Sequence, residues 1–171
     1  LSHNGGMVLG GLDEGRQVEL VVGKLGTDSE NPERVAMARL KHCSHLLAVH
    51  PEYRERGLGH SLKCAQREAV IRQGVRLITW TYDPLLSLNA HLNIRRLGAV
   101  CRTYLRDAYG LMRDEMNAGG LSDRFQVDWW VTSQRVISRL EGSRRPLDLA
   151  HFLEAGAEKV NSAGLGPDDL P

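Results

Sequence analysis

The chain lacks a hydrophobic run long enough to cross a lipid bilayer. Its 171 residues are 42% hydrophobic and 25% charged, which is ordinary for a soluble globular protein. No apolar run approaches the roughly 20 residues that a transmembrane helix needs, and no secretory signal pattern is present. The length suits one domain with a proper core, and we expect no membrane partner.

The sequence also lacks an excess of charge of one sign. Its 22 lysines and arginines nearly balance 21 aspartates and glutamates, leaving a formal charge of +1. A nucleic-acid-binding domain usually has a basic face or stripe, whereas the arginines here are scattered. We therefore expect no nucleic-acid partner.

Cysteine is scarce and occurs in an odd number. Three cysteines at wide spacing do not form a disulfide framework, which favours a reducing, cytoplasmic location. Among the seven histidines the closest group is His42-Cys43-Ser44-His45, and no second pair at ligand spacing accompanies it. Because zinc sites usually need three or four convergent ligands, we expect no metal site.

Turn residues divide the chain into short strands and helices. Strands are expected over residues 7–12, 17–25, 44–49, 75–82, 99–105 and 125–131. Helices are expected over 58–73, 87–97, 111–117 and 134–140, while 33–41 is a short helix or an ordered loop. This order predicts a mixed α/β (α+β) domain over residues 1–141 with a partly antiparallel sheet. Glycine, proline and charge become frequent from residue 142, so 142–171 is predicted to be a loosely packed or interface-forming tail.

The first long helix is predicted to be amphipathic. Its apolar residues Leu58, Leu62, Ala65 and Ala69 follow a spacing of four, three and four, which places them on one face. Gly74 is well placed to end this helix. We expect that face to pack on the sheet.

A glycine-rich turn joins the third strand to this helix, with the sequence Arg54-Glu55-Arg56-Gly57-Leu58-Gly59-His60. The first amides of a helix have no partner inside it, and together with the helix dipole they attract an anion. Glycine lets the backbone approach phosphate oxygens, and the two arginines add charge. The turn is neither a Walker A loop nor a dinucleotide-binding fingerprint. It predicts a phosphate-bearing ligand, although an ordinary strand-to-helix turn also uses glycines.

Two segments resemble motifs of the GNAT superfamily of N-acetyltransferases. Arg54, Gly57 and Gly59 are similar to the Gln/Arg-x-x-Gly-x-Gly/Ala motif that binds acetyl-CoA, and Leu47, Val49 and Pro51 resemble its lead-in. The segment 89–99 resembles the later helix, which begins with Asn and ends in Leu-Gly. The resemblance spans about residues 7–131, and within it Trp80 to Leu85 resembles a subgroup of predicted acetyltransferases of unknown substrate. It implies a central, mostly antiparallel sheet with splayed strands, flanked by helices.

The resemblance also implies a function, an acyltransferase that moves an acetyl or small acyl group from acetyl-CoA to an amine. The amine attacks the thioester directly in a ternary complex. The cofactor-binding residues it implies are Leu47, Ala48, Val49, Arg54, Arg56, Gly57, Leu58, Gly59, His60, Ser61 and Asn89. The strand backbone would bind the pantetheine amides, the amides of residues 56–61 the pyrophosphate, and Asn89 the thiol end.

Catalysis by such an enzyme needs a base, since a free lysine-type amine is almost fully protonated at pH 7. His45, His50 and Glu19 are the candidates, although a strand histidine is more often structural. Many relatives have a tyrosine acid four residues before the glycine of the later helix, where this chain has Ile94. Tyr104 or Tyr82 is the alternative acid.

Two further interpretations stay open. The chain is also compatible with a non-catalytic acyl-CoA-binding module of the same fold, because of Ile94 and the short segment before Met7, where relatives have acceptor-walling helices. It is also compatible with a nucleotide-binding α/β domain unrelated to coenzyme A. The acceptor is a small-molecule or peptide amine, and a homodimer through the late strands and the tail is compatible with the pattern.

Overall fold

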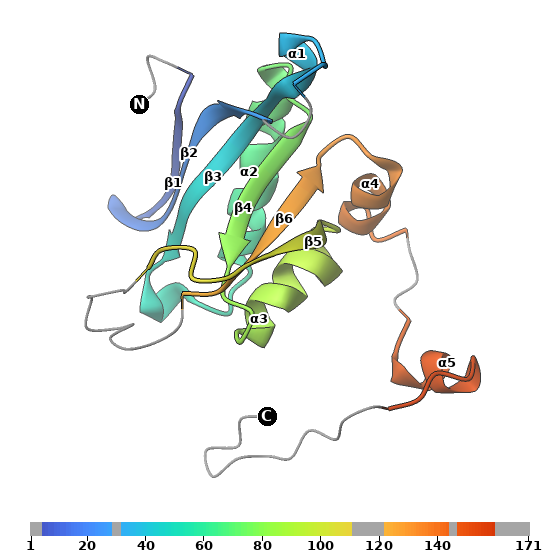
Figure 1. Cartoon of the computed structure of the whole chain (residues 1–171). Helices are drawn as coiled ribbons and strands as arrows, with labels where there is room; N and C mark the ends of the chain where they lie inside the picture. The colour runs from blue at the N-terminus through green and yellow to red at the C-terminus, as the bar shows by residue number, and fades with distance from the viewer. Residues whose placement is uncertain (1–4, 29–31, 111–121, 144–146, 160–171) are drawn as a thin grey trace.

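Six strands form a single sheet in a computed structural model, which describes residues 5–28, 32–110, 122–143 and 147–159. The strands are β1 (Met7–Asp13), β2 (Arg16–Thr27), β3 (Leu40–Val49), β4 (Leu77–Tyr82), β5 (Val100–Leu105) and β6 (Arg124–Trp130). Their order across the sheet is β1-β2-β3-β4-β6-β5 (Figure 1). All neighbours are antiparallel except β3 and β4, which are parallel. This confirms the predicted mixed fold with a mostly antiparallel sheet flanked by helices.

The helices are mostly short. They are α1 (Ala36–Arg39), α2 (Leu58–Arg72), α3 (Ser87–Ala90), α4 (Gln134–Leu140) and α5 (Leu149–Glu154), with a 3-10 turn at Pro51–Tyr53. Directly after α3 the chain continues as a π-helical segment, His91–Arg96. No helix within the described ranges is long and apolar enough to span a membrane. The helix expected over 111–117 lies outside the described residues.

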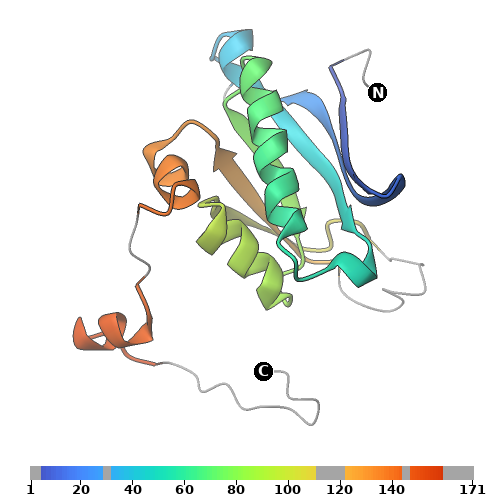
Figure 2. The same ribbon diagram turned by 180° about the vertical axis from the view of Figure 1, so that it is seen from behind.

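Helix α2 covers the back of the sheet, as Figure 2 shows. Its buried residues are Leu62, Lys63, Gln66 and Val70. The predicted face was therefore wrong at Ala65, which is exposed. The true face repeats every four residues from Leu62, and the polar Lys63 and Gln66 on it hid this periodicity. The end of the helix was predicted correctly, since Gly74 follows it with φ +77°.

The core lies between the sheet and the helices behind it. Its fully buried side chains include Val70, Ile78, Leu97, Val127, Trp129, Val131 and Val136. The indole nitrogen of Trp129 donates a hydrogen bond to the Leu97 carbonyl at 2.8 Å. Trp130 points to the opposite face and is 44% exposed, as alternation along a strand requires.

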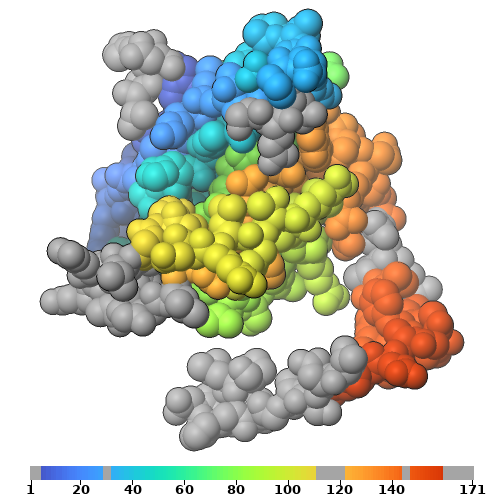
Figure 3. All heavy atoms as spheres, viewed as in Figure 1, coloured from blue at the N-terminus to red at the C-terminus, as the bar shows by residue number. Residues whose placement is uncertain are grey.

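The front of the sheet carries less cover. No helix of the described residues lies across the face shown in Figure 1. Val8 and Leu46, which both pair with Val22 and so share one face of the sheet, are exposed. The turn after β5, yellow in Figure 3, lies over the lower part of this face next to β3. There the hydroxyl of Tyr109 is 2.9 Å from that of Thr81 on β4. This turn therefore closes the front of β4 near its end.

Two boundaries differ from the expectation. Strand β3 begins at Leu40, not Ser44, because residues 40–43 pair with β2 despite the polar Lys41 and His42. The segment 33–41, expected as a helix or an ordered loop, contains the four-residue helix α1 and the start of this strand. The polar side chains at the start of β3 did not suggest a strand, but strand pairing depends on backbone hydrogen bonds.

Candidate functional site

Strands β3 and β4 separate after two residue pairs. His42 pairs with Ile78 and Cys43 with Thr79. Beyond these pairs β3 continues along β2 as far as Val49, and β4 continues along β6. The facing edges of the two strands therefore leave backbone N–H and C=O groups available to a ligand.

A β-bulge accounts for the separation. Leu46 of β3 pairs with Val22 and Ser44 pairs with Gly23, so His45 is the extra residue. A bulge bends its strand and increases the local twist. The bulge lies two residues after the last pair with β4, so the bend directs the rest of β3 away from that strand.

Two adjoining cavities follow the resulting gap. The inner one, about 260 Å³, lies between the strands and is lined by Ser44, His45, Leu46, Leu47, Lys63, Trp80, Thr81, Tyr82, Asn89, Leu92 and Asn93. The outer one, about 400 Å³, is lined by residues of the glycine-rich turn, α2 and the segment 88–96. Leu47 and Leu92 line both cavities. A long, narrow ligand can therefore run from the start of α2 into the gap.

The start of α2 has the backbone geometry of an anion site. Gly57 precedes the helix with φ +80°, a left-handed conformation that favours glycine. The amides of His60 and Ser61 donate to the Gly57 carbonyl at 3.0 and 3.1 Å. The amides of Leu58 and Gly59 precede these donors and have no helical acceptor. Of the amides expected to bind pyrophosphate, these two are the best placed.

Two arginine side chains supply positive charge to the outer cavity. Arg54 and Arg96 line it together with His60, and Arg54 Nε also donates to the Val49 carbonyl at 3.4 Å. Burial, and then the charge of Arg96, lower the pKa of His60. Arg56 lies beside the cavity, its guanidinium 5.0 Å from the centroid of the Tyr53 ring. The cavity thus has the positive potential that a phosphate group needs.

The candidate catalytic residues lie in three different places. His45 lines the gap, at the bulge. Glu19 lies on β2 in a separate hollow beside His50, where burial raises its carboxyl pKa. Tyr104 is exposed and donates a hydrogen bond to Asp123, which raises the tyrosine pKa. The structure therefore brings His45 to the gap and leaves Glu19 and Tyr104 outside it.

The alternative acid and the cofactor-contact residue both reach the gap. Tyr82 lines it, and burial raises the pKa of its hydroxyl. Asn89 lines it from α3. Ile94 packs against the hydrophobic core instead. The backbone of 47–49 follows the free edge of β3, as the resemblance implied.

A cluster of buried polar side chains that was not predicted lies beneath the gap. Lys63 Nζ donates to Ser44 Oγ at 2.8 Å and to Gln66 Oε1 at 3.2 Å, and lies 3.8 Å from the centroid of the Trp80 ring. Burial lowers the pKa of Lys63 to about 7. The available signal was the four-residue repeat Leu62, Gln66, Val70, which places Gln66 on the buried face.

His42 extends this polar group away from the gap. Its Nε2 lies 3.2 Å from Gln66 Nε2, and burial, followed by the charge of Lys63, lowers its pKa to about 4. His42 and His45 therefore lie in different surroundings, one buried and one at the gap. Across the described ranges no three His, Cys, Asp or Glu side chains gather as a metal site would require, and the three cysteines are free thiols.

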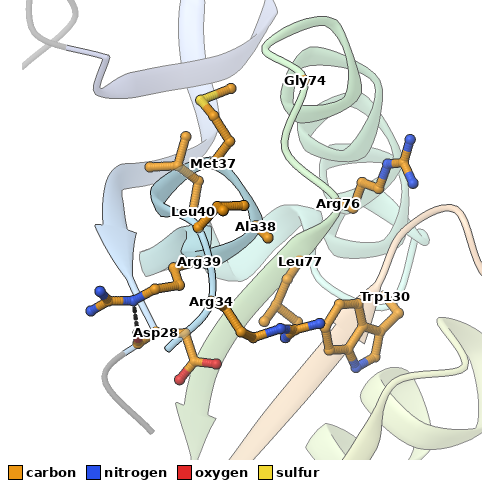
Figure 4. Close-up of a pocket in the computed structure, with 11 residues that line it drawn as sticks. Asp28, Arg34, Met37, Ala38, Arg39, Leu40, Gly74, Arg76, Leu77 and Trp130 are labelled. Atoms are coloured by element: carbon orange, nitrogen blue, oxygen red, sulfur yellow. Dashed lines mark hydrogen bonds between the residues drawn. The ribbon is translucent and has the colours of Figure 1, made fainter. Parts of the chain in front are cut away.

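Another cavity, about 450 Å³, lies at the opposite end of the sheet (Figure 4). Leu40 and Leu77, at the starts of β3 and β4, line it, and Arg39 Nε donates to the Asp28 carbonyl at 2.9 Å. Ligands of parallel strands usually bind at the carboxyl ends. The gap lies at those ends, so we assign the candidate site to the gap and not to this cavity.

Comparison with known proteins bears on the fold. Neither a protein-family model nor a curated protein matches the chain. Chaetomium thermophilum Naa20, solved in complex with a bisubstrate analogue, matches with a TM-score of 0.58 and 15% identity over 77% of this chain and 68% of that one. The acetyltransferase of GNAT family from Streptococcus pneumoniae gives 0.55 and 16% over 73% of this chain and 67% of that one.

A chain of the NatC complex bound to Gag peptide and CoA is also similar. Its TM-score is 0.53 with 19% identity over 68% of this chain, which spans 62% of the length of the NatC chain. At such identities the likeness establishes the fold, and it agrees with the splayed strands and the anion site described above. The chain therefore has the fold of the GNAT acetyltransferases.

Proposed function

We propose that this chain is an acyltransferase that moves an acetyl or other small acyl group from acetyl-CoA to an amine. The observation that carries the proposal is the separation of β3 from β4 after the Cys43–Thr79 pair, with a cavity that continues to the start of α2. An acyl-CoA has a long arm with amide groups that can bond to two unpaired strand edges. A plain nucleotide has no such arm.

The cofactor is oriented by its two ends. The amides of Leu58 and Gly59, with Arg54 and Arg96 beside them, bind the pyrophosphate. The edge of β3 over 47–49 binds the pantetheine amides, and Asn89 contacts the arm from the other side. The thioester then lies near the bulge, where the backbone N–H of His45, which has no partner residue on β2, would stabilise an oxyanion.

The reaction we propose is direct attack of a neutral amine on the thioester carbonyl, with the thiol of CoA as leaving group. His45 is the candidate base because it lines the gap. Glu19 would have to act through water, from its separate hollow. Tyr82 is the better placed acid, since Tyr104 is bound to Asp123. A tyrosine with a raised pKa donates a hydrogen bond at neutral pH, although full proton transfer to a thiolate of pKa about 8.5 is uphill.

The NatC complex was solved bound to a Gag peptide and CoA, and Naa20 in complex with a bisubstrate analogue. These ligands support a peptide or small-molecule amine as acceptor here. The proposal also includes a cytoplasmic location and a homodimer. A non-catalytic acyl-CoA-binding module is the second candidate, favoured by Ile94 in place of the usual acid.

The test is isothermal titration of the chain with acetyl-CoA, followed by a thiol-release assay with a panel of amines. Binding with turnover supports the enzyme and begins to identify the acceptor. Binding without turnover across the panel favours the binding module. A folded chain that binds neither acetyl-CoA nor CoA contradicts both.

A further inference from the structure

An ammonium group lies at the closed end of the gap. Lys63 is 3% exposed, and its Nζ lies 2.8 Å from Ser44 Oγ and 3.8 Å from the centroid of the Trp80 ring. Ser44 and Trp80 are the residues directly beyond the last pair, Cys43 and Thr79. The side chain of Lys63 therefore occupies the point where the two strands part.

This ammonium has no anionic partner within the described part of the chain. Its hydrogen-bond acceptors, Ser44 Oγ and Gln66 Oε1, are neutral. A buried lysine is rare in proteins unless it is paired with a carboxylate. An unpaired cation at the end of a ligand cavity is a feature that a bound anion would complement.

Two neutral donors accompany it. The Ser44 oxygen accepts from Lys63, which leaves the serine hydrogen available to a ligand. Asn93 is 4% exposed and lines the same cavity, and its side-chain amide has no hydrogen-bond partner among the described residues. The methyl of an acetyl group binds more favourably in apolar surroundings. The cation and the two neutral donors found here would bind a carboxylate better than a methyl.

The inner end of the gap is also where the acyl group would lie. Strand β3 covers about 16 Å from Val49 to Ser44, at about 3.3 Å per residue. A pantetheine arm that starts at the amides of Leu58 and Gly59 and follows this edge brings its thioester toward Ser44. The acyl chain beyond the thioester then points to Lys63.

We propose that the acyl group bound here ends in a carboxylate, so that the preferred donor is a dicarboxylic acyl-CoA such as succinyl-CoA. The carboxylate accepts hydrogen bonds from Ser44 and Asn93 and lies beside the ammonium of Lys63. This inference rests on the proposed function, because it assumes that an acyl-CoA occupies the gap.

Binding of such a donor is coupled to protonation. Burial without an anion lowers the pKa of Lys63 to about 7, and a neighbouring carboxylate raises it again. Binding therefore takes up a proton, and affinity falls above pH 7 by at most about tenfold per pH unit. The titratable groups facing this site are His42 and His45 on β3 and Tyr82 on β4. The Lys63→Met variant keeps these three groups, so the difference in pH dependence between the wild-type chain and this variant reports on Lys63.

The experiment compares succinyl-CoA with butyryl-CoA, which carries a methyl in place of the carboxylate. Isothermal titration of the full chain at pH 6.5 should show succinyl-CoA binding about tenfold tighter or more, since one charge interaction is worth about one pKa unit. The advantage should shrink at pH 8.5. Lys63→Met should remove the preference by lowering the affinity for succinyl-CoA much more than the affinity for butyryl-CoA. Lys24→Met, an exposed lysine on β2, is the matched control and should keep the preference.

Equal binding of the two esters by the wild-type chain would overturn this inference and leave the proposed function standing. Failure of a folded chain to bind either ester would overturn both. If Lys63→Met does not fold, Ser44→Ala replaces it, with an expected loss of most of the preference. A preference that does not change between pH 6.5 and 8.5 would also count against the role of Lys63.

Discussion

Cys43 and Thr79 are the last residues at which β3 and β4 pair, and the bulged His45 follows them two positions later. This relationship fixes the depth of the gap, because the strands are parallel before it and diverge after it. The residues proposed to bind the acyl-CoA lie just beyond this pair and at the start of α2, and substitutions at the two places can be tested separately.

Gly59→Asp is expected to abolish acyl-CoA binding, since a carboxylate would point at the pyrophosphate. Gly59→Ala is the control. A Cβ at this position meets the side chains of Leu47 and Leu92 at 3.7 and 3.9 Å, which is ordinary van der Waals contact. The alanine variant should therefore fold, and it should bind CoA more tightly than the aspartate variant because it adds no negative charge. Titration of both variants with CoA is the measurement, and unchanged affinity in a folded Gly59→Asp would remove the turn from the site.

Tyr82→Phe is expected to lower kcat by about tenfold, the effect of one lost hydrogen bond in the transition state. Tyr104→Phe should leave kcat unchanged, because its hydroxyl is bound to Asp123 outside the gap. Steady-state thiol release with a productive amine measures both. The opposite result, a loss at Tyr104 alone, would place the acid at the edge of the sheet.

Gly23→Ala is expected to destabilise the fold by about 2 kcal/mol or more, as overpacked cores do. Its Cβ would lie 2.0 Å from Nε2 of the buried His42. Urea unfolding measures the loss. His42→Ala should relieve the clash, so the double variant should lose less stability than the sum of the two single changes. Additive losses would mean that the ring moves aside without cost.

The stability of the fold is expected to rise with pH between about 7 and 10. The pKa of Lys63 is lowered from its ordinary value to about 7 in the folded state. Between those two values the unfolded chain binds more protons than the folded chain, so the free energy of unfolding increases with pH. Urea midpoints at pH 7, 8 and 9 test this, and the rise should be smaller in Lys63→Met. An equal slope in both proteins would contradict the assignment.

The sequence predicted the elements that follow a regular pattern. The strands after Met7 and Gln17, the turn at Gly57 and the end of α2 at Gly74 each have local signals, namely alternation, glycine and helix periodicity. The position of β6 between β4 and β5 has no local signal, since pairing partners are chosen in three dimensions. Alternation along β6 does place Trp129 and Trp130 on opposite faces of the sheet.

The candidate site was predictable in its outer part and hidden in its inner part. The turn from Arg54 to Gly59 follows a recognisable pattern, so the anion site could be expected. Lys63 and Gln66 were missed because polar residues on a predicted helix are normally assigned to solvent, although the four-residue repeat Leu62, Gln66, Val70 places Gln66 on the buried face. Their burial depends on partners, Ser44 and His42, from a strand about 20 residues earlier.

Because only two residue pairs join β3 to β4, the sheet consists of two blocks that are weakly connected. Strands β1, β2 and β3 form one block and β4, β6 and β5 another, and α2 bridges their backs (Figure 2). In the proposed complex, a ligand arm whose amides bond to both strand edges would supply the hydrogen bonds that the protein itself leaves out. The cofactor would then serve as a seventh strand, and its binding should protect the edge amides of both blocks from hydrogen exchange at the same time.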